Sequence, residues 1–284
     1  MRAPLGNLLR SALLTGVLAL AVGCGASGGY LSAEPPTPAV QGAQVASSAT
    51  AQRLGVQVLS VRPHDPGAFT QGLLSNGGLL YESTGLVGQS SLREVDPGSG
   101  DVVRRLDVPP PIFAEGLALV GDRLIQITWQ NGVAFVYDRA TFDKIGEFQY
   151  TGEGWGLCFD SQRLVMSDGS NQLFFRDPQT FDLLGQVSVL RDGQPVVRLN
   201  ELECVGDQVY ANVWQTDEIV KIDRDSGRVT ATIDASGLLS PQEQISRSAD
   251  DVLNGIAYDP DSGTFLVTGK RWPRLYEVSF VSTP

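Results

Sequence analysis

Hydrophobic and polar residues alternate along most of the chain with a period of two. Runs rich in Val, Ile, Leu, Phe and Tyr are broken by Gly, Asp, Asn and Pro, and no long stretch has the period of a helix. This pattern predicts an almost entirely β protein. The runs recur in units of roughly forty residues, and a sheet of that size buries its face only by stacking on copies of itself.

Five units open with similar short segments. Each opening leads into an alternating strand, a turn and further strands. The openings are Thr70-Gln71-Gly72-Leu73, Ala114-Glu115-Gly116-Leu117, Gly154-Trp155-Gly156-Leu157, Asn200-Glu201-Leu202-Glu203 and Asn254-Gly255-Ile256-Ala257. Stacked repeats of this kind are typical of a β-propeller, so the sequence predicts a five-bladed β-propeller over residues 53–284.

Turns that begin with Asp separate the last two strands of four predicted blades, at 96–100, 138–142, 177–181 and 223–227. Asp favours such turns because its side chain bonds to its own backbone. An extra strand at 55–61 precedes the first unit, whereas the fifth unit ends at 275–280 without an outer strand. We therefore expect the N-terminal strand to complete the last blade and remove its exposed edge.

The first 23 residues have the pattern of a secretory signal peptide, with Arg2 and Arg10 and an apolar run at 12–22 that is too short to span a membrane. Cys24 follows directly, as in bacterial lipoproteins whose N-terminal Cys carries lipid; a chance Cys in an ordinary secretory signal is the alternative. Residues 24–52 are rich in Ala, Ser, Gly and Pro and predict a flexible tether. Both interpretations predict export to the periplasm or cell envelope, with membrane contact only through the lipid.

The chain is acidic. Its formal net charge is −11, and removal of the two signal-peptide arginines makes the charge −13. This charge argues against binding to nucleic acid and suits a cationic ligand such as a peptide α-ammonium group. Solubility alone explains the acidity equally well.

Cys158 and Cys204 occupy similar positions in successive units. Export permits a disulfide between them. Equivalent positions on neighbouring blades are, however, often further apart than the separation of about 7 Å between Cα atoms that a disulfide allows. We therefore expect two buried thiols.

The single histidine narrows the chemistry. His64 cannot form a His-rich zinc site, and a Ser-His-Asp triad would have to use it. The chain also has no phosphate-binding loop and no dinucleotide fingerprint. The sequence therefore predicts carboxylate chemistry without a metal or cofactor.

Superposition of the five units predicts two rings of side chains at one face of the propeller. The first strand of each blade lines the central channel, and the entry residues of these strands are Gln71, Glu115, Trp155, Glu201 and Asn254. The second strands end at the same face, because neighbouring strands are antiparallel, with Thr84, Trp129, Asp168, Trp214 and Lys270. Carboxylates, amides, indoles and an amine together suit acid–base chemistry beside an aromatic wall. The alternative is that the indoles pack between blades and the acids are solvated loop ends.

Eight segments resemble, in order, those of the plant-type and bacterial glutaminyl-peptide cyclotransferases, or glutaminyl cyclases. The segments are HDPGAFTQGL (64–73), YESTGL (81–86), GQSSLR (88–93), GEGWGL (152–157), MSDGS (166–170), LNELE (199–203), ANVW (211–214) and NGIA (254–257). The resemblance covers residues 54–280. It implies a five-bladed propeller that converts the N-terminal Gln of peptides to pyroglutamate, releases ammonia and uses no catalytic zinc.

The resemblance implies a set of pocket residues, which the ring comparison extends. Gln71 and Asn200 would orient the substrate carboxamide. The full set expected to contact or act on substrate is Phe69, Gln71, Glu115, Trp129, Trp155, Asn200, Glu201, Trp214, Asn254 and Lys270. The expected partners are peptide or protein N-termini that begin with Gln, and we expect a monomer.

Within this set, Glu115, Glu201 and Lys270 are the expected catalytic residues. Glu115 would carry a proton from the attacking α-amine to the departing ammonia, in a pocket where walls of Trp155 and Trp214 raise its pKa. Glu201 would anchor the α-ammonium group or share the proton transfer. Lys270 would hold the oxyanion or neutralise the glutamates, and the sequence leaves both roles open.

Two other functions stay open at this point. A non-catalytic propeller of the cell envelope would bind peptides or protein partners at the same face, since fold does not fix function. A propeller hydrolase with a central metal would need several inward Asp, Asn and Glu ligands and would lose activity to a chelator. The sequence meets that ligand set poorly, so the cyclotransferase is the favoured interpretation.

Overall fold

The computed structural model describes residues 50–283 and shows an all-β arrangement with one short helix, α1 (Pro241–Ser246). In this part of the chain no helix has the length and apolarity needed to cross a bilayer. The predicted signal peptide at 1–23, Cys24 and the tether up to residue 49 lie outside the described residues. The predictions for that segment therefore stay predictions.

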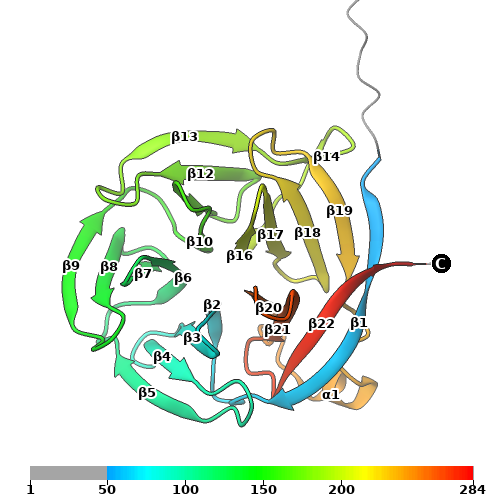
Figure 1. Cartoon of the computed structure of the whole chain (residues 1–284), viewed down its shortest axis with the longest axis horizontal. Coiled ribbons are helices and arrows are strands. Elements are labelled where there is room, and N and C mark those ends of the chain that lie inside the picture. The colour runs from blue at the N-terminus through cyan, green and yellow to red at the C-terminus, as the bar shows by residue number, and fades with distance from the viewer. Residues whose placement is uncertain (1–49, 284) are drawn as a thin grey trace, which may run out of the picture. The chain divides into compact units, whose positions relative to one another are not determined.

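Three four-stranded antiparallel sheets follow one another along the chain, each with its strands in sequence order (Figure 1). The first contains β2 (Thr70–Asn76), β3 (Leu79–Thr84), β4 (Ser91–Val95) and β5 (Val102–Asp107). The second contains β6 (Ala114–Val120), β7 (Arg123–Thr128), β8 (Val133–Asp138) and β9 (Lys144–Gln149). The third contains β10 (Leu157–Phe159), β11 (Leu164–Met166), β12 (Gln172–Arg176) and β13 (Leu183–Ser188).

An eight-stranded sheet contains most of the remaining strands, in the order β16-β17-β18-β19-β1-β22-β21-β20. Its strands are β1 (Gln52–Pro63), β16 (Leu199–Val205), β17 (Gln208–Val213), β18 (Glu218–Asp223), β19 (Val229–Asp234), β20 (Leu253–Asp259), β21 (Thr264–Gly269) and β22 (Arg274–Ser282). A two-stranded hairpin of β14 (Leu190–Arg191) and β15 (Gln194–Pro195) precedes β16. Helix α1 lies in the insertion between β19 and β20.

Strand β1 joins the two halves of the eight-stranded sheet. It pairs antiparallel with β22 along Leu54–Pro63 and parallel with β19 along Gln52–Gly55 (Figure 1). The pairing with β22 confirms the expectation that the N-terminal strand adds the outer strand after the C-terminal one. The parallel pairing with β19 was not expected, and it leaves no open edge at this point.

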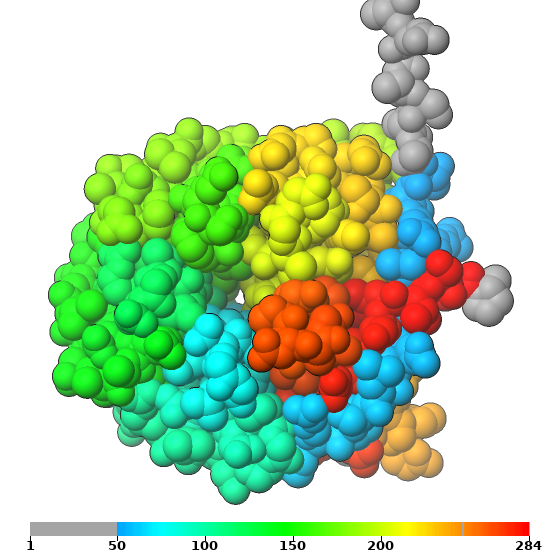
Figure 2. All heavy atoms as spheres, viewed as in Figure 1, coloured from blue at the N-terminus to red at the C-terminus, as the bar shows by residue number. Residues whose placement is uncertain are grey.

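The sheets lie around a common axis in a propeller-like ring (Figure 1). The innermost strands contact one another in a closed cycle, β2 to β6, β10, β16, β20 and back to β2. Side chains fill the spaces that the ribbons leave between neighbouring sheets (Figure 2). For example, Ile125 and Ile127 of β7 form one buried cluster with Leu164 and Met166 of β11, which explains the alternating pattern of the strands.

The four turns that begin with Asp lie where the sequence predicts, between the third and fourth strands of their sheets. In each turn an Asp carboxylate accepts hydrogen bonds from nearby backbone N–H groups. The bonds from Gly98 to Asp96 and from Gln179 to Asp177 both measure 2.7 Å. This geometry confirms the predicted turns.

Glycines allow the innermost strands to approach one another near the axis. A Cβ atom added to Gly72 would lie 2.6 Å from the backbone N of Leu117, and one added to Gly116 would lie 2.5 Å from the backbone N of Leu157. Any side chain at these two positions would push neighbouring sheets apart. The Gly in the unit openings therefore reflects packing around the axis.

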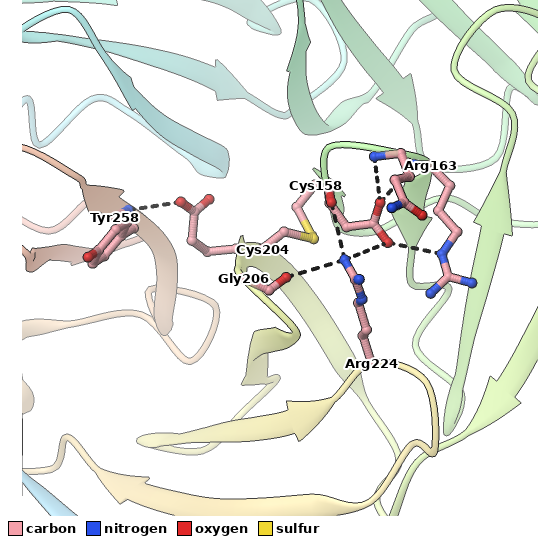
Figure 3. Close-up of a disulfide and its surroundings, with 9 residues drawn as sticks. Cys158, Arg163, Cys204, Gly206, Arg224 and Tyr258 are labelled. Atoms are coloured by element: carbon pink, nitrogen blue, oxygen red, sulfur yellow. Dashed lines mark hydrogen bonds and ion pairs between the residues drawn. A yellow bond between two sulfur atoms is a disulfide. The ribbon is translucent and has the colours of Figure 1, made fainter.

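Cys158 on β10 and Cys204 on β16 form a disulfide, so the expectation of two free thiols is wrong (Figure 3). Their Cα atoms are 5.5 Å apart, within the range that a disulfide needs. The innermost strands converge on the axis, so residues there lie closer to the next sheet than residues further out. The wider separation expected between equivalent positions on neighbouring blades does not apply near the axis.

Candidate active site

A cavity of about 300 Å³ lies where the innermost strands begin and the second strands end. Its lining residues are Phe69, Gln71, Leu86, Phe113, Glu115, Trp129, Trp155, Asn200, Trp214, Asp250 and Lys270. Eight of the ten side chains expected from the sequence are among them. The two exceptions are Glu201 and Asn254.

The register of the inner strands explains the position of Glu201. A β-bulge interrupts the pairing of the first two strands in four of the sheets or half-sheets, as between Thr70 and Gly72 on β2 and between Leu199 and Leu202 on β16. Counted from the bulge, Asn200 corresponds to Gln71. The equivalent ring positions are therefore Gln71, Glu115, Trp155, Asn200 and Asn254.

Glu201 occupies the next position, where the other inner strands have Gly. Its carboxylate accepts hydrogen bonds from the backbone N–H groups of Leu73 at 3.3 Å and Ile256 at 2.8 Å, and its residue is 1% exposed. Burial, and then the nearby Glu203, raise the pKa of Glu201 well above its ordinary value. Glu201 joins three inner strands, and it does not share the cavity with Glu115 as the sequence comparison expected.

The ring of residues expected at the ends of the second strands is also shifted by one position in two sheets. Thr84 pairs with Thr70, and by the same count Asp168 occupies the equivalent place after β11. Neither side chain lines the cavity. The residues that do line it stand one position further along the chain, and they are Trp129, Trp214 and Lys270.

In the other two sheets the residue at the position of Trp129 is Gly, and an aromatic ring occupies the space that a side chain there would fill. A Cβ atom added to Gly85 would lie 2.4 Å from the ring of Phe113, and one added to Gly169 would lie 2.7 Å from the ring of Trp155. The glycines therefore make room for two of the aromatic side chains in the cavity wall.

Glu115 lies at the end of a chain of amide contacts that runs from Asn254 through Gln71. Its Oε1 atom accepts a hydrogen bond from Nε2 of Gln71 at 3.0 Å. Nδ2 of Asn254 donates to Oε1 of Gln71 at 3.3 Å and to the carbonyl oxygen of Thr70 at 2.9 Å. Asn254, expected to bind substrate, thus lies behind Gln71 and fixes the orientation of its amide.

Burial dominates the electrostatics of the two ionisable groups in the cavity. It raises the pKa of Glu115 well above the ordinary value; Lys270 opposes this shift and Glu153 adds to it. Burial lowers the pKa of Lys270, against the effects of Glu115 and Asp250. The Lys270 ammonium group also lies 4.9 Å from the centroid of the Phe69 ring. Both pKa values therefore shift towards neutral pH, where proton transfer is most effective.

Aromatic rings form the wall of the cavity, as the sequence predicts. Trp155 and Trp214 meet edge to face, with centroids 5.5 Å apart and planes at 88°. Phe113 contacts Trp129 at 5.6 Å and Phe69 at 6.3 Å. Such contacts exclude water from the neighbouring carboxyl and ammonium groups.

Asn200 lines this cavity and contains a buried acceptor without a partner among the described residues. Its side chain is 2% exposed, and its Oδ1 atom has no hydrogen-bond partner within residues 50–283. Ser167 donates a hydrogen bond to the backbone carbonyl oxygen of Asn200 at 2.7 Å, which holds this part of the strand. A buried acceptor without a partner is costly, so a ligand N–H group that meets it would be stabilised.

Sequence reasoning missed several residues of the site. Phe113 directly precedes the second unit opening, and Asp250 comes from the insertion that contains α1. Glu153 lies within the GEGWGL segment and accepts hydrogen bonds from the indole Nε1 atoms of Trp129 at 2.7 Å and Trp155 at 2.9 Å. The sequence signal for Glu153 was its place in that segment, two residues before an expected pocket residue.

His64 lies outside this site. Its Nε2 atom is 3.0 Å from Oε1 of Glu82, and its Nδ1 atom is 2.7 Å from the carbonyl oxygen of Trp272. Burial opposes protonation, but Glu82 and the carbonyl raise the pKa of His64 overall. Within residues 50–283 no group of three or more His, Cys, Asp or Glu side chains is arranged to hold a metal ion.

The sequence profile of the glutamine cyclotransferase family matches residues 33–280. The chain belongs to this family. Among the relatives of this chain, a glutaminyl-peptide cyclotransferase of Arabidopsis thaliana is 42% identical over 225 residues, which cover 78% of this chain and 70% of the relative. The crystal structure of the Myxococcus xanthus glutaminyl cyclase matches with a TM-score of 0.77 and 40% identity, over 82% of this chain and 100% of that chain. The family resemblance seen in the sequence is confirmed.

Proposed function

We propose that this protein is a glutaminyl-peptide cyclotransferase that closes the N-terminal Gln of peptides or proteins to pyroglutamate and releases ammonia. The observation that carries the proposal is the juxtaposition of a buried carboxyl group and a buried ammonium group in one indole-walled cavity. The 42% identity to a curated cyclotransferase supports it.

The reaction joins two groups of the same substrate residue. The α-amino nitrogen attacks Cδ of the side-chain carboxamide, the N–Cδ bond forms, and the bond from Cδ to the amide nitrogen breaks as ammonia leaves. Because the nucleophile is already tethered, the enzyme mainly holds the side chain in the ring-closing geometry. Such positioning contributes up to about 7–11 kcal/mol.

Glu115 is the proposed proton carrier. It takes a proton from the attacking amine and gives a proton to the departing nitrogen, so the carboxyl group ends each cycle unchanged. Gln71 occupies Oε1 of Glu115, which leaves Oε2 for the substrate. The raised pKa supports this role because it brings Glu115 closer to an α-amine, whose pKa is about 7.7–8.0.

Lys270 and Asn200 are proposed to bind the reacting groups. The Lys270 ammonium group stabilises the negative charge that develops on the carboxamide oxygen in the tetrahedral intermediate. Oδ1 of Asn200 accepts an N–H bond from the substrate and thereby fixes its orientation. Phe69, Trp155 and Trp214 enclose the Gln side chain.

Glu201 is proposed to have a structural role instead of a catalytic one. Both backbone N–H groups that bind its carboxylate belong to other inner strands, β2 and β20. It therefore stabilises the packing of those strands around the axis. This role replaces the proton-transfer and anchoring roles expected from the sequence.

The proposed architecture behind the site is a ring of five blades. Three blades are the four-stranded sheets, and the two halves of the eight-stranded sheet are the others, β16–β19 and β20–β22 completed by β1. The closed cycle of contacts among the innermost strands supports this division. Each blade then contributes one residue at the ring position of Gln71.

Export and lipid attachment at Cys24 are part of the proposal, with the mature protein a monomer. The signal-peptide pattern supports export, and the disulfide between Cys158 and Cys204 suits an oxidising compartment. Replacement of Cys24 by Ser tests the anchor. We expect the variant in the soluble fraction after cell lysis, and membrane association equal to wild type would contradict the lipid.

An assay with a Gln-initiated peptide tests the function. We expect ammonia release together with a mass loss of one ammonia per peptide, at a rate that a metal chelator does not change. Binding of the peptide without ammonia release would favour the non-catalytic envelope propeller. Loss of activity with the chelator would place the chemistry on a metal and contradict the roles given to Glu115 and Lys270.

A further inference from the structure

Glu153 joins two side chains that form separate parts of the cavity wall. Its Oε2 atom accepts hydrogen bonds from the indole N–H groups of Trp129 and Trp155, at 2.7 and 2.9 Å, while its Oε1 atom accepts from Nε2 of Gln130 at 2.8 Å. Trp129 follows β7, and Trp155 precedes β10, so the carboxylate connects two neighbouring sheets. One side chain thus fixes two indoles relative to each other.

We propose that Glu153 is a positioning residue for the cyclisation: it holds the indoles of Trp129 and Trp155 in the orientation that receives the N-terminal Gln. The proposal rests on the function proposed above. It adds a residue that does not line the cavity and acts only through residues that do.

Packing alone does not fix the indole of Trp129. This residue is 37% exposed, and its described ring contact is with Phe113. Trp155 has a ring contact with Trp214. The carboxylate of Glu153 therefore supplies a hydrogen bond to each indole, in addition to these ring contacts, that restricts its rotation. Hydrogen bonds to an ionised acceptor are about twice as strong as neutral ones.

The backbone around Glu153 is shaped to present its side chain. Gly152 has a φ of 91°, a conformation that side-chain-bearing residues rarely adopt. Gly154 has no room for a side chain, because an added Cβ atom would meet the hydroxyl oxygen of Tyr150. The N–H group of Gly154 also donates to the carbonyl oxygen of Trp129 at 2.9 Å. Both flanking glycines therefore hold Glu153 beside the indoles.

The charge of Glu153 also acts on Glu115. Burial alone would raise the pKa of Glu153, but the hydrogen bonds from Gln130 and the indoles lower it, so the carboxylate stays ionised. This charge raises the pKa of Glu115, whereas Lys270 lowers it. Tyr150, whose own pKa is raised, first by burial, also interacts with Glu115, and Asp250 lines the same cavity. Removal of the Glu153 charge should therefore move the pKa of Glu115 downwards.

Glu153→Gln is the main test, because it keeps the side-chain size and removes the charge and one acceptor. We expect KM for a Gln-initiated peptide to rise roughly tenfold, with a smaller change in kcat, since the indoles lose their common acceptor. The acidic limb of the pH–rate profile should shift to lower pH. Near-UV circular dichroism should change as well, because the Trp155–Trp214 pair is held less tightly.

Glu147→Gln is the matched control. Glu147 is an exposed carboxylate on β9 that bonds to Lys144, away from the cavity. The variant should keep the wild-type KM, pH profile and circular dichroism. A KM change in this control equal to that of Glu153→Gln would assign the effect to general loss of negative charge and overturn the proposal.

A double-mutant cycle with Trp129→Phe tests whether Glu153 affects KM through the indole of Trp129. This change removes the indole N–H group and keeps an aromatic ring. If Glu153 acts through the indoles, the two substitutions together should raise KM by less than the product of their separate effects. Independent effects, or a KM for Glu153→Gln equal to wild type, would overturn the proposal. If Glu153→Gln does not fold, an unchanged KM in Trp129→Phe overturns it instead.

The experiment separates this inference from the proposed function. Absence of ammonia release by the wild type would reject the cyclotransferase, whatever the variants do. The circular dichroism of unliganded Glu153→Gln still reports on the indole positions in that case. An active wild type with unchanged KM, pH profile and spectrum in the variant would reject only the role of Glu153.

Discussion

Glu115 and Glu201 are both buried glutamates on innermost strands, and burial raises the pKa of both. Glu115 faces the cavity and receives one side-chain hydrogen bond, which leaves its second oxygen for a ligand. Glu201 faces the interior of the ring, where two backbone N–H groups bind its two oxygens. Burial and a raised pKa therefore do not identify a reactive carboxyl group by themselves. What distinguishes Glu115 is an oxygen that remains accessible from a cavity.

The largest expected effect comes from Glu115→Gln. The substitution removes the proton carrier, so kcat should fall by about 10²–10⁴-fold while the fold is kept. Ammonia release measures the rate, and far-UV circular dichroism checks the fold. The same substitution at Glu201 is the matched control and should keep most of the activity. Equal losses in the two variants would remove the distinction between the glutamates.

Loss of the disulfide tests the interior of the ring, where Glu201 lies, without changing a residue of the cavity. Cys158 and Cys204 are 46 residues apart in sequence, and replacement of both by Ser should lower the free energy of unfolding by about 2–4 kcal/mol. Activity per folded molecule should remain, because neither residue lines the cavity. Urea unfolding of the oxidised wild type and the double variant gives the difference. Wild-type stability in the variant would show that the cross-link contributes little.

Glu201→Ala should lower stability by an amount similar to the loss of the disulfide. The backbone N–H groups of Leu73 and Ile256 would lose their acceptor, and each such unsatisfied group costs about 1–3 kcal/mol. The melting temperature should fall, and kcat at a temperature where the variant is folded should stay near wild type. A drop in kcat comparable to that of Glu115→Gln would return a catalytic role to Glu201.

The pH dependence of stability tests a third buried glutamate, Glu203. Burial raises the pKa of Glu203 to about 8 from its ordinary value of 4.5, and its carboxylate accepts a bond from the N–H group of Tyr258 at 3.0 Å (Figure 3). Between these pH values the unfolded chain has lost the proton that the folded protein keeps. The contribution of this group is therefore greatest below pH 4.5 and is lost as the pH rises towards 8.

Glu203→Gln is the variant that isolates this contribution. We expect the free energy of unfolding to decrease less between pH 5 and pH 8 in the variant than in the wild type, by urea unfolding at several pH values. Other groups contribute equally to both proteins. Parallel curves for the two proteins would mean that Glu203 titrates normally.

The sequence predicted the strands well because burial on alternate faces leaves a strong period-two pattern. The Asp turns and the pairing of β1 with β22 follow from the same pattern. The position of Glu201 was wrong by one residue because β16 has no Gly at the bulge. The Gly in the other openings marks close backbone approach, and alignment on sequence alone could not recognise a strand that fills that place with a carboxylate.

Other parts of the site depend on contacts that no local pattern records. Asp250 reaches the cavity from an insertion whose shape is set by tertiary contacts, such as the bond from Trp272 to the carbonyl oxygen of Asp251 at 3.0 Å. The role of Glu153 depends on an indole from a different sheet. The disulfide depends on how closely β10 and β16 converge. In each case the missing information was a distance between sheets.

Strand β1 also affects the order in which the molecule assembles. Its side chains meet partners at the far end of the chain, as Ser60 meets Glu277 across 217 residues. Pairing over such a separation is slow, and during synthesis β1 emerges long before β22. Until the two strands meet, the edges of β19 and β22 are open to other molecules. Refolding at high concentration is therefore the condition under which one chain would insert its first strand into another.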